Sequence, residues 1–151
     1  MSSEPEIVEK LKSKFKDAIV DANVPRKTRV IISAKKGKVL DLASYLKKEL
    51  GFDFVVSVCG LEMPQENEFT VVYHFWSTSN KILLTLKTKV PKESPEIQSI
   101  MPIFESANWH ERETYEMWGI KFINHPDLGM LLLPEDWSEK PPQRKDFTLP
   151  R

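Results

Sequence analysis

The sequence predicts an α+β domain followed by an extended C-terminal arm. Apolar residues recur at helical spacing in three segments, and they alternate with polar residues in segments between residues 53 and 90. Residues 134–151 differ, because they contain four prolines and follow neither period. We therefore divide the chain into an α/β body, residues 1–133, and an extended C-terminal arm, residues 134–151.

The first predicted element is a helix. Ser3 and Glu6 have the spacing of a capping box, in which each side chain accepts a hydrogen bond from the other residue's backbone N–H group. Asn23 and Pro25 are expected to end the helix. Between these signals one apolar stripe repeats every four residues, at Ile7, Leu11, Phe15 and Ile19.

Four segments are predicted to form strands. Residues 29–33 are a short run rich in β-branched residues. Three longer segments, rich in Val, Phe or alternating apolar residues, lie at residues 53–61, 69–77 and 82–90. The polar residues 77–80 suit a hairpin between the last two segments.

Further helices are predicted on either side of the longer strands. Helical spacing predicts one at residues 39–50, and Gly51 is its expected stop. A short helix is predicted to start at Pro95, since proline is tolerated in a first turn. A longer helix is predicted at residues 103–118, with Gly119 ending it.

The apolar stripe of this last helix is interrupted by a carboxylate. The stripe passes through Phe104, Ala107, Tyr115 and Trp118, and Glu111 stands where the spacing expects a hydrophobic residue. A buried carboxylate must be paired or neutral, because desolvating a lone charge is costly. Two interpretations stay open: the acidic face meets water, or it meets another protein that supplies hydrogen-bond donors.

Other charged residues of this helix are expected to make polar contacts. Arg112 is expected to pair with Glu116 four residues later, and Glu113 and Glu116 offer acceptors on one face. A metal site is not expected. The zinc-protease motif that His110 begins needs a second histidine where Thr114 stands, and a di-metal site needs Glu-x-x-His pairs on two helices.

Composition and missing motifs exclude several classes of function. The 22 basic and 22 acidic residues cancel, which argues against a general binder of nucleic acids or anionic membranes. Cys59 is the only cysteine and is expected to be a buried structural thiol, so a disulfide or a cysteine-ligated iron–sulfur cluster within this chain is excluded. Glycine-rich nucleotide-binding motifs and the Gly-x-Ser-x-Gly nucleophile motif are absent.

The arm has two interpretations. It cannot make a core of its own, yet it carries Trp137, Phe147 and Leu149 at wide intervals. It is either a disordered tail or a segment that folds onto a partner with the aromatic residues as anchors. We favour the second interpretation, because a purely disordered tail would carry fewer large apolar residues.

Several motifs within residues 100–150 are similar to those of one family. Residues 111–120 (ERETYEMWGI) resemble the signature of the C subunit of NADH-quinone oxidoreductase, the thirty-kilodalton subunit of respiratory complex I. Its lead-in and continuation occur in the family's order, as ANWH at residues 107–110, HPDL at 125–128, LLLPEDW at 131–137 and RKDF at 144–147. The first hundred residues fit the family only in their pattern of helices and strands.

The resemblance implies a two-layer α/β fold with a mixed sheet of four to five strands. It implies no cofactor and no catalytic residue in this chain, with iron–sulfur clusters and quinone bound by partner subunits. It places the chain in the peripheral arm, on the cytoplasmic face of the cell membrane. There it would pack against the hydrogenase-large-subunit-like subunit and lie near iron–sulfur subunits, with the C-terminal segment wrapping over its partner.

The expected function is that of a non-catalytic subunit that supports assembly and electron transfer from donor to quinone, coupled to ion translocation. An equivalent subunit of a membrane-bound hydrogenase, or of a complex without the NADH module, stays open. Two other classes also stay open: a hydrolase that uses His110 and the carboxylates, and a single-strand nucleic-acid module that uses Tyr73, Phe75 and Trp76.

The resemblance also assigns a set of residues to the subunit interface or the family signature. These are Glu111, Arg112, Glu113, Glu116, His125, Pro126, Asp127, Trp137, Arg144, Lys145, Asp146 and Phe147.

Overall fold

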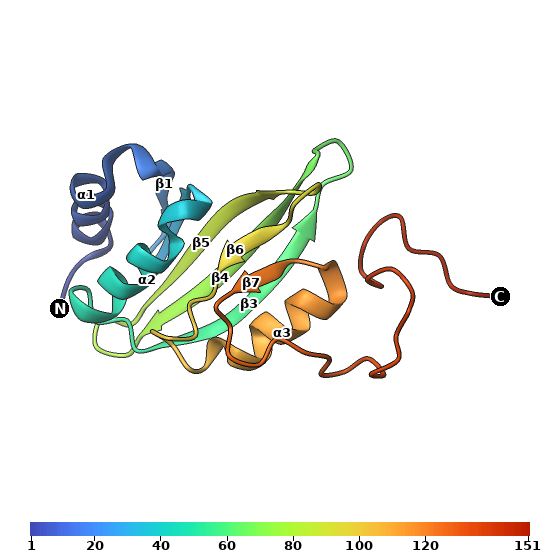
Figure 1. The fold of residues 1–151 in the computed structure, drawn as a ribbon. Coiled ribbons are helices and arrows are strands. Elements are labelled where there is room, and N and C mark those ends of the chain that lie inside the picture. Colours follow the sequence, from blue (N-terminus) through green and yellow to red (C-terminus); the bar gives the residue numbers. More distant parts are fainter.

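A five-stranded mixed sheet forms the centre of the computed structural model, which describes residues 1–151 (Figure 1). The strand order is β1-β2-β5-β4-β3, and only the β2–β5 pair is parallel. A parallel pair needs a crossover, and the chain makes it through a helix and two further strands of the same sheet. The bounds are β1 Ile19–Arg26, β2 Arg29–Ala34, β3 Phe54–Glu62, β4 Glu68–Ser77 and β5 Ile82–Pro91.

Three α-helices and a second, two-stranded sheet complete the fold. The small sheet pairs β6 (Glu96–Gln98) with β7 (Lys121–Ile123) in parallel. Figure 1 shows β6, β7 and α2 in front of the large sheet. The helices are α1 Glu4–Phe15, α2 Val39–Lys48 and α3 Ala107–Trp118, with short 3₁₀ turns at Lys16–Ala18 and Lys36–Lys38. The predicted α+β class with a two-layer mixed sheet is confirmed.

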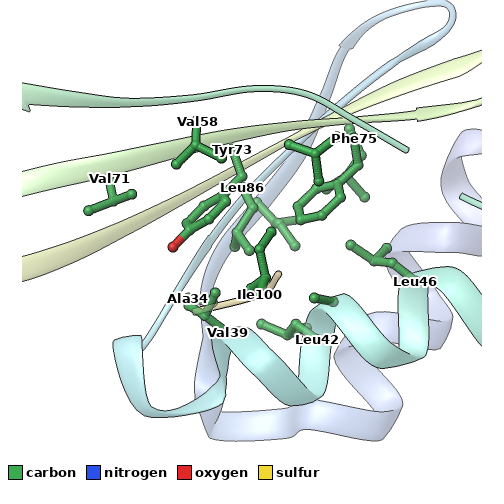
Figure 2. Close-up of a cluster of buried hydrophobic side chains, with 14 of the residues drawn as sticks. Ala34, Val39, Leu42, Leu46, Val58, Val71, Tyr73, Phe75, Leu86 and Ile100 are labelled. Carbon is green, nitrogen blue, oxygen red and sulfur yellow. The ribbon is translucent and has the colours of Figure 1, made fainter. Parts of the chain in front are cut away.

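One hydrophobic core fills the space between the large sheet and the helices. Strand β4 points Phe69, Val71, Tyr73 and Phe75 into it, and β5 contributes alternate residues from Ile82 to Val90. Figure 2 shows Val39, Leu42 and Leu46 of α2 pointing at this face of the sheet. Successive side chains alternate between the two faces of a strand, so the opposite face of the large sheet carries the residues between these. Helices therefore cover one face only.

The predicted first helix was too long. It starts at the predicted capping box, where the N–H group of Ser3 donates to Glu6 at 2.8 Å, but it ends at Phe15. Lys16 has a φ of 43°, which breaks the helical path, and residues 19–26 turn back as strand β1 beside β2. The four-residue period that included Ile19 could not distinguish this edge strand from another helical turn.

Two other local predictions were also wrong. The segment after Pro95 is strand β6 rather than a short helix, because its backbone pairs with β7, which lies some 25 positions away in the sequence. Cys59 is exposed rather than buried. A bulge between Val55 and Ser57 shifts the alternation by one residue, so Val58 faces the core and Cys59 the outside.

Gly60 has no space for a side chain. A Cβ atom there would lie 2.6 Å from Cδ1 of the Trp118 indole, whereas a Cβ atom at Gly37 would meet no atom within 4 Å. We expect Gly60→Ala to lower the free energy of unfolding by about 1–3 kcal/mol through overpacking. Urea unfolding would measure this, with Gly37→Ala as the control, and equal stabilities of the two variants would contradict it.

Candidate docking surface on helix α3 and the C-terminal segment

Helix α3 is fixed along the edge strand β3. The Oγ1 hydroxyl of Thr114 donates to the carbonyl of Val58 at 3.1 Å, and the backbone N–H of Val55 donates to the hydroxyl of Ser106 at 3.1 Å. These contacts satisfy backbone groups that an edge strand would otherwise leave open. The helix ends at Gly119, whose φ of 75° gives the left-handed C-terminal stop that the sequence predicted.

Glu111 is completely buried and receives its donors from its own chain. The Ser99 hydroxyl donates to Oε2 at 2.6 Å, and the backbone N–H of Ile100 donates to Oε1 at 2.9 Å. This residue was expected to face water or another protein. The structure instead supplies an internal partner, the segment that follows β6.

The Glu111 carboxyl lies in a buried titratable cluster. Burial raises the pKa of Glu111 to about 7, although the hydrogen bonds from Ser99 and Ile100 oppose this shift. The His125 side chain, also fully buried, has Nε2 4.0 Å from the carboxylate. Its Nδ1 accepts from the Asp127 N–H at 3.1 Å, which assigns the proton to Nε2, facing the carbonyl of Asn108 at 3.3 Å. Burial, and secondly the Glu111 charge, raises the pKa of the buried Tyr73 hydroxyl.

The Glu116 side chain binds the backbone N–H groups of residues 131–133. Its buried carboxylate accepts hydrogen bonds from Leu131 at 2.9 Å, Leu132 at 2.9 Å and Leu133 at 3.2 Å. Three successive amides converging on one anion form a nest, and hydrogen bonds to charged groups are the stronger class. The predicted Arg112–Glu116 pair is therefore wrong, because this carboxylate is occupied by the backbone.

Arg112 holds the same segment by its carbonyl groups. Its Nη2 donates to Met130 at 2.8 Å and its Nε to Gly129 at 3.4 Å, while Nη1 lies 3.7 Å from Asp127. The guanidinium also lies 5.3 Å from the centre of the Trp109 ring, within cation–π range. Side chains of one helix thus bind both N–H groups and carbonyl groups of residues 129–133. We call this segment the leucine ledge.

The leucine ledge presents apolar side chains to the outside. Leu132 is 62% exposed, and Trp109 on the neighbouring helix face is 57% exposed. An apolar group on a backbone fixed by six side-chain hydrogen bonds loses little conformational entropy when a partner covers it. This surface has the properties of a protein docking site.

Residues 140–147 of the arm lie against the chain's own body. The N–H of Gln143 donates to the Met117 carbonyl at 3.1 Å, and the N–H of Lys145 donates to the Glu62 carboxylate at 2.7 Å. The Arg144 guanidinium lies over the Phe69 ring, 5.1 Å from its centre. Lys92 also pairs with Glu62, at 2.7 Å. The arm is therefore attached to the body over this stretch rather than extended throughout.

The two aromatic residues of the arm pack on each other. The rings of Trp137 and Phe147 lie 6.1 Å apart, and the loop between them is closed by a 2.9 Å ion pair of Lys140 with Asp146. Both rings are half-buried. Beyond this loop Leu149 is 81% exposed.

The predicted site residues thus fall into three groups and a remainder. Glu111 and His125 share the buried cluster. Arg112, Glu116 and Asp127 surround the leucine ledge. The third group lies in the closed loop of the arm and consists of Trp137, Arg144, Asp146 and Phe147. The side chains of Glu113, Pro126 and Lys145 are exposed and join none of these contacts. Ser99 and Glu62 were not identified from the sequence, because their contacts are with segments distant in the chain. The only signal for Ser99 was that Glu111, if buried, needs a hydrogen-bond donor.

No three His, Cys, Asp or Glu side chains are grouped as a metal ion requires. None of the helices is both long and apolar enough to cross a bilayer.

Comparisons with known proteins show the family to which the chain is similar. The model of the family described as "Respiratory-chain NADH dehydrogenase, 30 Kd subunit" matches residues 32–151. The C subunit of the F(420)H(2) dehydrogenase of Methanosarcina mazei is 43% identical over 141 residues, which cover 93% of this chain and 89% of the relative. The C subunit of the NADH-quinone oxidoreductase of Geobacter sulfurreducens is 37% identical over 151 residues, covering 99% and 92%.

Two solved structures share the fold. A chain of the membrane-bound sulfane sulfur reductase, an archaeal respiratory membrane complex, superposes with a TM-score of 0.78 at 21% identity, covering 87% of this chain and 77% of the other. A trypsin-resistant fragment of Nqo5 superposes with a TM-score of 0.68 at 24% identity, covering 82% and 98%. At these identities the likeness concerns the fold, and it includes the sheet and helices described above.

The buried Glu111 is expected to make stability depend on pH. Its pKa is about 7 in the folded protein against an ordinary 4.5, so the folded state binds more protons between these values. The free energy of unfolding should therefore fall as pH rises from about 4.5 to 7, by on the order of 3 kcal/mol. Glu111→Gln should flatten this slope in denaturant titrations across pH, and Glu113→Gln on the exposed face should not. A slope retained in Glu111→Gln would rule the assignment out.

Glu116→Gln is expected to loosen the leucine ledge. A neutral amide keeps one acceptor for three partly buried N–H groups and loses the charge, and hydrogen bonds to charged groups contribute about 1.5–3 kcal/mol. Hydrogen exchange at the amides of residues 131–133 should accelerate about 10- to 100-fold. Mass-spectrometric exchange would measure this against Glu113→Gln, and unchanged protection would show that the ledge is held otherwise.

Proposed function

Because the chain belongs to the family of 30-kDa subunits of the respiratory-chain NADH dehydrogenase, we propose that it is a peripheral-arm subunit of a membrane-attached, quinone-reducing oxidoreductase. The observation that carries this proposal is the match of the family model to residues 32–151. In such a complex the chain would support assembly, and so the transfer of electrons from donor to quinone that drives ion translocation. It would lie on the cytoplasmic face of the membrane, held there by its partners.

The leucine ledge is the proposed primary contact with a partner subunit. Leu132 and Trp109 are exposed apolar residues on a rigid backbone, and aromatic or apolar anchors carry most of the energy of protein interfaces. The partner in this proposal is the hydrogenase-large-subunit-like subunit, with iron–sulfur subunits nearby. Glu111, Arg112 and Glu116 act within the chain, as the groups that position this surface.

The arm is proposed as a second contact with a partner. Its attachment to the body determines which of its residues are held in place and which are free to bind. Residues 140–147 are anchored through Gln143, Arg144 and Lys145, so they present a fixed loop with Trp137 and Phe147 half-buried. Residues 148–151, with the exposed Leu149, are free to lie on the partner. The arm would then dock from a defined starting point, which lowers the entropy lost on binding.

The chain is proposed to be non-catalytic. The buried carboxylates of Glu111 and Glu116 are engaged by donors of the chain itself, and their roles are explained by folding contacts alone. The iron–sulfur clusters and the quinone would be bound by partner subunits.

An affinity purification from gently solubilised native membranes tests the proposal. Tagged wild-type chain should co-purify with the large-subunit-like partner, iron–sulfur subunits and membrane subunits. Leu132→Asp should reduce their recovery at least tenfold, because burying a carboxylate in an apolar contact is costly. Met63→Asp, at a residue 52% exposed in the β3–β4 loop, is the matched control.

Circular dichroism of the purified variants would show that both fold. Recovery of a free wild-type chain without partners would overturn the proposed function. Full recovery of the partners by Leu132→Asp would overturn the role of the ledge alone.

A further inference from the structure

The outer face of the large sheet carries exposed apolar and charged side chains that none of the contacts described above explains. Helices and the small sheet pack on the core face, which leaves the alternate side chains of β2–β5 facing outward. The strand register fixes how these side chains are arranged. Phe54 of β3 pairs with Trp76 of β4, which pairs with Leu83 of β5, which pairs with Arg29 of β2.

This face is amphipathic across the strands. On the β3–β4 side it carries Phe54, 42% exposed, Leu61, 45% exposed, and the half-buried Trp76. On the β5–β2 side it carries Arg29 and the exposed Lys87. The end of the face where Phe54 and Trp76 lie is therefore apolar on the β3–β4 side and cationic at Arg29, whereas the other end carries the paired charges of Lys89 and Glu68.

Neither cation has an acidic partner. No carboxylate lies within 4.0 Å of Arg29 or Lys87, whereas Lys89 on the same strand is paired with Glu66 at 2.9 Å and Glu68 at 3.7 Å. Arg29 and Lys87 both lie near the half-buried His74, and their charges add to burial in lowering its pKa. The middle of the face therefore has a positive potential that the chain does not neutralise.

We propose that this outer face binds an acidic amphipathic helix of another protein subunit, at a site separate from the leucine ledge. Strands β3, β4 and β5 together span about 10 Å, the diameter of one helix. The apolar stripe of the helix would cover Trp76 and Phe54, which lie level with each other on β4 and β3, and its acidic flank would face Arg29 and Lys87.

The register also predicts the spacing of the acidic residues. Arg29 is level with Leu83, and Lys87 lies four residues further along β5, about 13 Å away at the rise of a strand. A helix covers this distance in about nine residues at 1.5 Å each. Acidic residues seven to nine positions apart on one side of the apolar stripe would meet both cations.

An anionic membrane is the less favoured occupant. Lipid-binding surfaces of this kind gather about four to eight unpaired Lys and Arg residues. The outer face offers Arg29 and Lys87, and Arg26 on β1, level with Arg29, adds a third unpaired cation, so the face has fewer than that number. A protein helix fits the size and the charge of the face better.

Photo-cross-linking in the assembled complex tests the proposal. A benzophenone amino acid would replace Thr85, which lies between His74 and Ile31 at the centre of the outer face. We expect adducts with one segment of a partner subunit, bearing two acidic residues seven to nine positions apart beside an apolar stripe. The same probe at Lys12, exposed on α1, is the background control.

Charge reversal provides the second arm. Arg29→Glu with Lys87→Glu should lower the Thr85 adduct yield at least tenfold, and lysines in place of the partner's two acidic residues should restore it. Lys12→Glu with Lys14→Glu, on exposed positions of α1, should change nothing. Circular dichroism of each variant would exclude unfolding as the cause.

Several results would overturn the proposal: adducts no more abundant than at Lys12, adducts with lipid, or a captured segment without the acidic pair. The same probe at Leu132 separates this outcome from the proposed function. Adducts at Leu132 without adducts at Thr85 would remove the outer-face site and leave the proposed function standing. A chain that runs free on a native gel would remove the proposed function, and adducts at Thr85 would then support the outer-face site only if the captured segment carried the acidic pair beside an apolar stripe.

Discussion

The hydrogen bonds from three successive backbone amides to the Glu116 carboxylate set the shape of the surface around helix α3. A run of backbone that pairs with no strand or helix must find partners elsewhere if it is to be fixed. Glu116 accepts its N–H groups, and Arg112 donates to its carbonyls. The position of residues 129–133 therefore depends on two side chains one helical turn apart, and through them on the contact of α3 with β3.

The same helix is also tied to the small sheet. Glu111 takes its donors from Ser99 and Ile100, directly after β6, and His125 comes from the segment after β7. Buried polar groups of this kind are costly when unpaired and restrictive when satisfied. Here they fix the rotation of α3, because turning the helix would leave a buried carboxyl without its donors. That rotation in turn directs Arg112 and Glu116 toward the leucine ledge.

Sequence patterns correctly predicted the elements that have strong local signals. They failed where contacts with distant segments determine the secondary structure or the partner of a residue. The alternation in β4 and β5 and the helical stripe of α2 identified those elements correctly. Ile19 fitted a helical period but lies in β1, because its backbone pairs with β2. Glu111 was recognisable as a misfit in an apolar stripe, and it is buried. Its partners were not predictable, since Ser99 is brought to it only by the pairing of β6 with β7.

The arrangement of charge follows from a sheet that helices cover on one face only. Carboxylates that lie on the core side, such as Glu111 and Glu116, must be satisfied by the chain itself, and they are. On the outer face, water satisfies Arg29 and Lys87 in the isolated chain, so no internal partner is required there. Arg29 and Lys87 therefore lie where another subunit could replace that water. A subunit with contacts on both sides of its sheet would hold two partners at a fixed separation. Such a subunit would contribute to the complex without a catalytic residue of its own.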